Sequence, residues 1–170
     1  MSAESTSEVV RRLQKDADQR RAWVAEWARG VEAGVEQADF DRLWRSVLSL
    51  CDPRNIVACN RVRVDPRRSV VLALVFDPHR TRSEIQELDL AHHVCVRRSK
   101  WNRATLDDAH SLIEDLGDHN VKEIRESITP TGDLRFDIKL TSPPIRQTMT
   151  RIAEYPDGLF VIEQPHDFAD

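Results

Sequence analysis

The sequence predicts an α+β fold, in which two N-terminal helices and a mid-chain helix pack on a largely antiparallel, curved sheet. Three observations support this fold class. Two runs rich in β-branched residues flank a short Asp-Pro turn between Ile56 and Phe76, which is a hairpin pattern. Apolar residues recur at helical spacing before this hairpin. Strand-like and helical patterns then alternate along the rest of the chain.

Length and composition favour one domain over residues 1–170, with short flexible ends at about 1–6 and 165–170. A hydrophobic fraction of 40% and four Trp supply enough apolar surface for a core, which argues against intrinsic disorder. No apolar run reaches the ~20 residues of a membrane helix, so we expect no membrane partner. The sequence shows no signal peptide and no apparent internal repeat. Three Cys without a Cys-x-x-Cys pair predict reduced thiols and a cytoplasmic location.

Two amphipathic helices are predicted before the hairpin. The pattern Ser5-x-x-Glu8 fits a capping box that opens the first helix, and Gly30 is expected to end it. Asp39 is expected to cap the second helix, and Pro53 to stop it. The two apolar stripes consist of Val9, Leu13, Ala17, Val24, Trp27, Ala28 and Val31 in the first helix, and of Phe40, Leu43, Trp44, Val47 and Leu48 in the second.

The hairpin at 56–76 organises the predicted fold. Its second strand contains seven consecutive apolar residues, Val70–Phe76, and we expect this strand to be central and covered on both faces. In the first strand two Val alternate with Arg61 and Arg63, which predicts a strand with one wet, basic face.

The segment 77–103 allows two interpretations. A short helix that begins at Thr81-x-x-Glu84, followed from Leu88 by a strand of period two, is favoured; one helix through 82–97 is the alternative. Thr105-x-x-Asp108 then predicts the capping box of the mid-chain helix, and Gly117 its end.

The final third of the chain predicts two further hairpins. Val121–Ile128 and Leu134–Leu140 flank a Pro-Thr-Gly-Asp turn and form the first of them. Residues 144–155 fit either a strand or a helix. We favour the strand, because the Asp-Gly turn that follows is typical of a hairpin with Leu159–Glu163.

Charge is distributed unevenly along the chain, whose net charge is −4. Residues 51–103 hold eleven basic and six acidic side chains, a formal +5, whereas residues 104–170 hold six basic and fourteen acidic ones, a formal −8. The basic segment 54–103 therefore predicts an alternative function, nucleic-acid or phosphate-ligand binding, with cations on phosphates and a stacked Trp. The residues expected to act in it are Arg61, Arg63, Arg67, Arg68, Arg97, Arg98, Lys100, Trp101 and Arg103.

The sequence carries no chemistry-bearing motif that predicts an enzyme. His92-His93-x-Cys95 comes closest to a metal cluster, but on a strand His92 would point away from the others, and no second ligand pair follows at zinc-like spacing. We therefore predict no metal and no cofactor. Asp107, His110 and Glu114 share one side of a helix, where helix-end charge and a surface pair explain them best. Nucleophile elbows and Gly-rich phosphate loops are missing, so no catalytic residue is predicted.

These features predict a non-catalytic, cytoplasmic protein-interaction or adaptor module that binds another protein chain, most simply a second copy. Two long apolar stripes leave aromatic surface uncovered, and such surface is where partners anchor. The predicted partner-binding residues are Trp23, Trp27 and Trp44, with Trp23 partly exposed beside the main stripe. A small-molecule pocket protein or enzyme with a cone-like curved sheet is the third interpretation.

Overall fold

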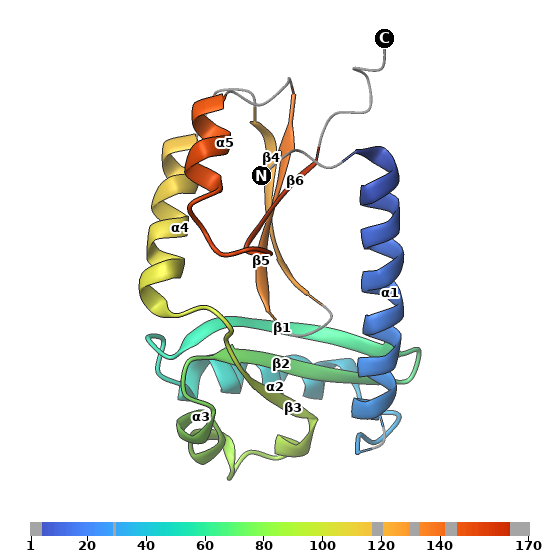
Figure 1. Ribbon diagram of the computed structural model, residues 1–170. Helices are drawn as coiled ribbons and strands as arrows, with labels where there is room; N and C mark the ends of the chain where they lie inside the picture. The colour runs from blue at the N-terminus through green and yellow to red at the C-terminus, as the bar shows by residue number, and fades with distance from the viewer. Residues whose placement is uncertain (1–4, 29, 117–120, 130–132, 142–145, 164–170) are drawn as a thin grey trace. The chain divides into compact units, whose positions relative to one another are not determined.

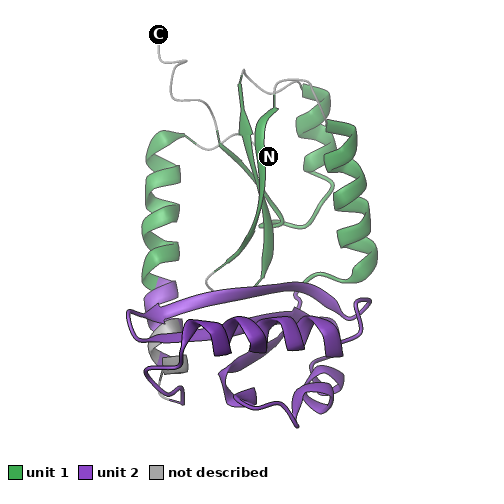
Figure 2. Ribbon diagram, turned by 180° about the vertical axis from the view of Figure 1, so that it is seen from behind, with its two compact units in different colours: residues 1–18, 101–170 green, residues 19–100 purple. Residues whose placement is uncertain are grey.

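Figure 1 shows the computed structural model of the chain. The structure describes residues 5–28, 30–116, 121–129, 133–141 and 146–163, except for the side chains of residues 24, 25, 27 and 28. The backbone contacts divide the chain into two compact units (Figure 2): the first-half unit, residues 19–100, and the second-half unit, residues 1–18 with 101–170. Helices and two three-stranded sheets confirm the α+β class. The single-domain organisation of residues 1–170 stays a prediction.

The first-half unit is a three-stranded sheet with two helices on one face. Strand β2 is central and pairs antiparallel with β1 and parallel with β3. Every side chain from Val70 to Val75 is buried, which confirms that this strand is covered on both faces. Apolar side chains of the helices meet Val71, Ala73 and Val75 in one core cluster. The elements are α2 (Gln37–Leu50), β1 (Ile56–Asp65), β2 (Arg68–Val75), α3 (Pro78–Ile85) and β3 (Val94–Arg98).

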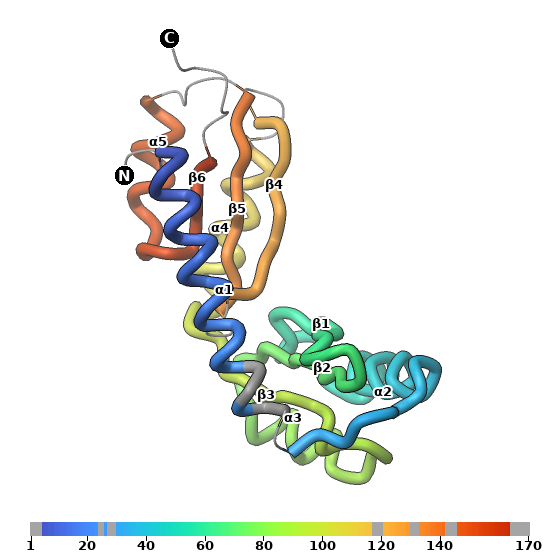
Figure 3. Tube along the Cα trace, turned by 90° about the vertical axis from the view of Figure 1, so that its right-hand side faces the viewer, coloured from blue at the N-terminus to red at the C-terminus, as the bar shows by residue number. Residues whose placement is uncertain are grey.

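The second-half unit has three layers, with α4 and α5 on one face of its sheet and the start of α1 on the other (Figures 1 and 3). Strand β5 is central, and its alternate residues Leu134, Phe136, Ile138 and Leu140 are buried. Trp101 and the apolar side of α4 are buried as well. The elements are α1 (Thr6–Ala28, shared with the first-half unit), α4 (Arg103–Leu116), β4 (Val121–Ile128), β5 (Leu134–Leu140), α5 (Arg146–Ile152) and β6 (Phe160–Glu163).

Helix α1 turns a charged face, and not its apolar stripe, toward the sheet of the second-half unit. Arg135 lies 3.0 Å from Asp16, and Arg12 lies 3.5 Å from Glu163. On this face of the sheet Arg135 of β5 and Glu163 of β6 are charged, so they pair with charged residues of the helix. Leu13, a member of the predicted apolar stripe, has an exposed side chain.

The two units repeat one αββαβ arrangement. Cys59 pairs with Ala73 in the first hairpin, and the residues 65 positions later, Ile124 and Ile138, pair in the second. Each hairpin has a register shift at its start, between Ile56 and Ala58 and between Val121 and Glu123. In each unit a helix then leads to a third strand that runs parallel to the second. The sequence did not reveal this repeat, because different apolar residues occupy equivalent positions.

The predicted N-terminal cap is confirmed for helix α1, whereas the caps of the later helices differ from the prediction. Ser5 and Glu8 form the predicted capping box. Helix α2 begins at Gln37, ahead of Asp39, and has no side-chain cap. The caps of α3 and α4 lie three or four residues before the predicted threonines: Asp77 accepts from the N–H groups of His79 and Arg80, and Asn102 from that of Thr105. An Asp or Asn oxygen satisfies free N–H groups better than threonine does. The predicted end of α4, Gly117, lies outside the described residues.

The predicted hairpins at 56–76 and 121–140 are confirmed, as are the short helix followed by a strand within 77–103 and the strand at 159–163. The start of β3 and the pairing of β6 differ from the prediction. Residues 88–93 form turns and a short 3₁₀ helix, Ala91–His93, so β3 begins only at Val94. Residues 146–152 form a helix, and β6 pairs with β5 in parallel, so the predicted third hairpin is wrong. A parallel strand requires a crossover segment, and α3 and α5 provide it. Both sheets are therefore mixed, each with a longer antiparallel pair and a shorter parallel pair of strands.

Candidate functional site

Trp44 and Arg61 join helix α2 to the edge strand β1. The indole N–H of Trp44 donates to the carbonyl oxygen of Cys59 at 3.1 Å, and the guanidinium of Arg61 lies 4.8 Å from the ring centre. Asp41 forms an ion pair with the same guanidinium. The hydrogen bond from Arg61 holds the pKa of Asp41 below its usual value. Trp44 is half-buried, and its contacts are within the chain: a cation–π contact and a hydrogen bond hold its side chain in place.

Trp23 is buried, with only 8% of its surface exposed, so the prediction that it lies partly exposed is wrong. The guanidinium of Arg97 lies 5.4 Å from the centre of its ring. Trp23 follows Asp16 by two helical turns, which places it on the inward face of α1. The side chain of Trp27 lies outside the described residues. Partner binding through these three Trp stays a prediction, but Trp23 does not supply exposed aromatic surface.

The basic residues predicted to bind nucleic acid do not form one set. Trp101 is buried and donates its indole N–H to the carbonyl oxygen of Leu134 at 2.7 Å, so its ring is not available for stacking on a base. Trp101 and Arg103 belong to the second-half unit, and the other seven residues to the first-half unit. Arg68 pairs with Asp65 at 2.6 Å. The exposed members are Arg61, Arg63, Arg67, Arg98, Lys100 and Arg103.

An exposed apolar stripe follows the outer side of helix α1. Val10 is 60% exposed and Leu13 is 51% exposed, the highest values among the large apolar side chains that the structure describes. Ala17, also exposed, continues them at i+7 from Val10, so all three share one side of the helix. We call Val10, Leu13 and Ala17 the outer stripe of α1. Periodicity identified Leu13 and Ala17 as stripe residues but not Val10, and it did not show which way the stripe faces.

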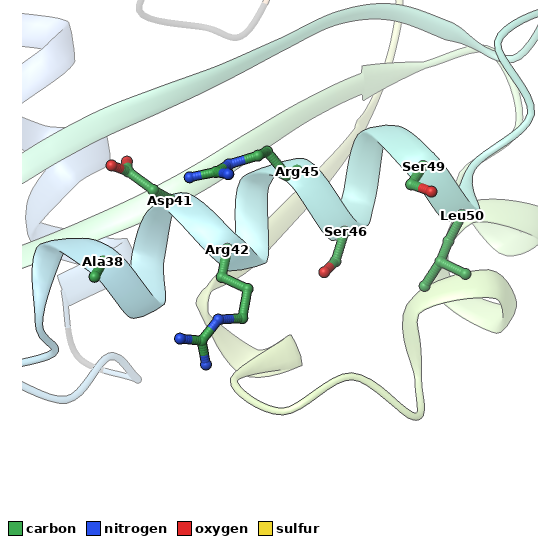
Figure 4. A pocket seen from close by; sticks show the side chains of 7 residues that line it. All are labelled: Ala38, Asp41, Arg42, Arg45, Ser46, Ser49 and Leu50. Carbon is green, nitrogen blue, oxygen red and sulfur yellow. The ribbon is translucent and has the colours of Figure 1, made fainter.

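A shallow hollow of about 720 Å³ follows the outer side of α2. Figure 4 shows that its lining comes from this one helix, with Asp41 and Arg45 on one flank and Arg42 and Ser46 on the other. Half-exposed Leu50 lies at its end. Because a single helix lines it and its charged side chains diverge, the hollow is an open surface and not an enclosed cavity.

The three thiols are buried or half-buried, and the imidazole on α4 contacts the sheet of its unit. Burial raises the pKa of Cys51 to about 11 and the pKa values of Cys59 and Cys95 to about 12. These free thiols are therefore protonated at neutral pH and are poor nucleophiles. His110 lies 3.1 Å from Glu126 of β4, so it pairs across to the sheet and not with Glu114 along the helix.

Three side chains of types that commonly serve as metal ligands lie close together in the first-half unit. Glu32, in the segment before α2, lies beside His92 and His93 of the 3₁₀ turn, and the ligand atoms of all three are within 4.8 Å of one another. The sequence grouped the two His with Cys95 instead. Glu32 was missed because about 60 residues separate it from the histidines, and no local pattern links them.

Every helix within the described residues is too short or too polar to cross a lipid bilayer. No protein-family model matches the chain, and no curated protein matches it. The function of the chain must therefore be inferred from its own geometry.

Proposed function

We propose that the chain is a non-catalytic protein-interaction module that pairs with a second copy of itself through the outer stripe of α1. The observation that carries this proposal is the orientation of α1. Arg12 and Asp16 hold one side of the helix to the sheet, while Val10 and Leu13 remain exposed on another side. Large apolar residues gathered at helical spacing on a surface are a common feature of helix-mediated interfaces.

A second copy of α1 is expected to run antiparallel, because that arrangement opposes the two helix dipoles favourably. In such a pair, crossing near Leu13, the outer stripe of each helix faces the outer stripe of the other.

The expected contribution of Leu13 follows from its exposure. Complete burial of an exposed Leu side chain contributes about 1.5–3 kcal/mol, and about half of this remains to be gained by Leu13, which is 51% exposed. A symmetric pair contains two copies of Leu13, so its removal should cost about 1.5–3 kcal/mol, or roughly 10- to 10²-fold in the dissociation constant. An acidic replacement adds the desolvation of a carboxylate, which acts in the same direction.

Sedimentation of the native chain and two variants over a micromolar concentration series tests this function. We expect the native chain to reach twice its 19.6 kDa mass, and Leu13→Asp to sediment as a monomer. Ala22→Asp is the matched control, because it introduces the same charge at an exposed position on the opposite side of α1. A native chain that stays monomeric removes self-association, and equal effects of both variants would remove the outer stripe as the contact.

A cytoplasmic location belongs to the same proposal, and the three free thiols support it. Nucleic-acid or phosphate-ligand binding by residues 54–103 stays a weaker prediction, because Trp101 is buried and Arg68 is paired. A ligand pocket in one cone-like sheet is weaker still, since the strands form two separate three-stranded sheets.

A further inference from the structure

We propose that Glu32, His92 and His93 form a zinc site in the first-half unit. The ligand atoms of the three residues lie within 4.8 Å of one another. Nε2 of His92 is 4.0 Å from Oε1 of Glu32, and the centres of the two imidazole rings are 4.4 Å apart. Two imidazoles and one carboxylate are a typical ligand set for zinc, with the fourth position of the tetrahedron left for water.

His93 provides the strongest evidence, because one of its nitrogens is buried without a hydrogen-bond partner. The residue is 1% exposed. Its Nδ1 lies 3.3 Å from the carbonyl oxygen of Ser69, so the tautomer with hydrogen on Nδ1 donates there and leaves a lone pair on Nε2. Nε2 finds no hydrogen-bond partner among the described residues. A buried acceptor left in this way costs about 1–3 kcal/mol, and a metal ion would use its lone pair. A carbonyl on the opposite ring nitrogen is the usual support of a metal-binding histidine.

The repeated architecture shows that the fold does not need a histidine at this position. In each unit the turn before the third strand closes with an N–H to carbonyl hydrogen bond, from His93 to Leu90 and from Leu159 to Pro156. Leu159 is fully buried in the second-half unit. His93 therefore occupies a core position that an apolar side chain fills in the equivalent turn. Packing alone does not explain a polar imidazole there.

The turn that carries the two histidines is also strained. Leu90 has φ 65° and ψ 19°, a left-handed conformation that is rare for a large side chain. In the equivalent turn Pro156 corresponds to Leu90, and the positive φ falls instead on Gly158, at φ 89°. Strain of this kind costs about 1–3 kcal/mol and is concentrated at functional sites. Leu90 immediately precedes the 3₁₀ helix Ala91–His93, so its backbone conformation orients the helix that carries the two histidines.

Zinc would require only the exposed ligands to move. Zinc–nitrogen bonds of about 2.0–2.1 Å place the donors of a tetrahedral site roughly 3.3 Å apart, which is closer than in the present arrangement. His92 and Glu32 have side chains that are 49% and 72% exposed, so both can rotate inward. His93 is held by the core and by Ser69. We therefore assign His93 as the fixed ligand and the other two as the ligands that close over the ion.

The test uses the full chain, stripped of metal with a chelator and titrated with zinc chloride by calorimetry. One equivalent should bind. His92→Ala and Glu32→Gln should each weaken binding by more than about 10-fold, because changing a residue that only supports a metal ligand already costs about that much. Both residues are exposed, so circular dichroism should show native folding in both variants. His79→Ala and Glu36→Gln are matched controls, since each changes an exposed residue of the same type in the same unit and should leave binding unchanged.

A second measurement on the native chain addresses His93 without a core substitution. Zinc should shift the imidazole nitrogen resonances of His93 in a ¹⁵N spectrum. The proposal is overturned by a chain that binds no equivalent of zinc, by binding that His92→Ala or Glu32→Gln leaves intact, by equal weakening in the controls, or by His93 resonances that do not change.

Discussion

Replacement of Leu72 in the central strand β2 should destabilise the chain more than most single substitutions. Leu72 is 1% exposed and Leu74 is 0% exposed, in agreement with the long apolar run that predicts a covered strand. Leu72→Ala removes the equivalent of about three methylene groups, worth about 2.4 kcal/mol of transfer free energy. The cavity left by incomplete relaxation adds to this loss, so we expect about 2.5–5 kcal/mol in the free energy of unfolding.

Urea unfolding followed by Trp fluorescence and by circular dichroism measures this loss. Leu50→Ala is the matched control, because it makes the same chemical change at a side chain that is 50% exposed, and it should cost less than about 1 kcal/mol. A loss below about 1 kcal/mol for both Leu72→Ala and Leu74→Ala would refute the central position of this strand. Coincident transitions by the two probes would support one cooperative domain, whereas two separate transitions would divide the chain at its two units.

Three further predictions concern single side chains. Trp101→Phe should lower the free energy of unfolding by about 1–3 kcal/mol, because the buried carbonyl of Leu134 loses its indole donor; thermal unfolding measures this. The hydrogen bond from Arg61 lowers the pKa of Asp41 in the folded state. The stabilisation by Asp41 is therefore present above its unfolded-state pKa and is lost as the pH falls through its folded-state pKa. Asp41→Asn should make the free energy of unfolding depend less on pH in the acid range, as urea titrations measure. Burial raises the pKa of Cys95 to about 12. Its contribution to the free energy of unfolding is therefore present below the unfolded thiol pKa of about 8.5 and declines as the pH rises toward the folded-state pKa. Cys95→Ala should flatten this decline in urea titrations at alkaline pH.

Local patterns were enough to predict the two hairpins. Val70–Val75 and Leu134–Leu140 carry their apolar signal within a few residues, and the structure has strands at both places. Local patterns also indicated strands near β3 and β6, but not the strands with which they pair. Their parallel pairing depends on the crossover through α3 and α5. The Asp-Gly pair at Gly158 indicates a turn before β6, but it does not show which strand β6 pairs with.

The surfaces of interest depend on contacts between distant residues. The periodicity of α1 identifies Leu13 as part of an apolar stripe, but the outward charges of β5, such as Arg135, turn that stripe to solvent. Likewise, adjacent histidines on a strand would diverge, whereas the 3₁₀ turn at Ala91–His93 brings them together beside Glu32. Neither outcome follows from residue spacing alone, because each depends on which segment packs nearby.

The αββαβ repeat also has a kinetic consequence. Each sheet forms from segments that are close in sequence: the parallel pairs join Val71 with Val94 and Phe136 with Phe160. Short loop closures of this kind favour rapid folding of each sheet. The ion pair between Asp16 and Arg135, in contrast, joins residues 119 positions apart. Docking of the start of α1 should therefore be the last step of folding and the first contact to open, and hydrogen exchange should be fastest in its amides among the helices of that unit.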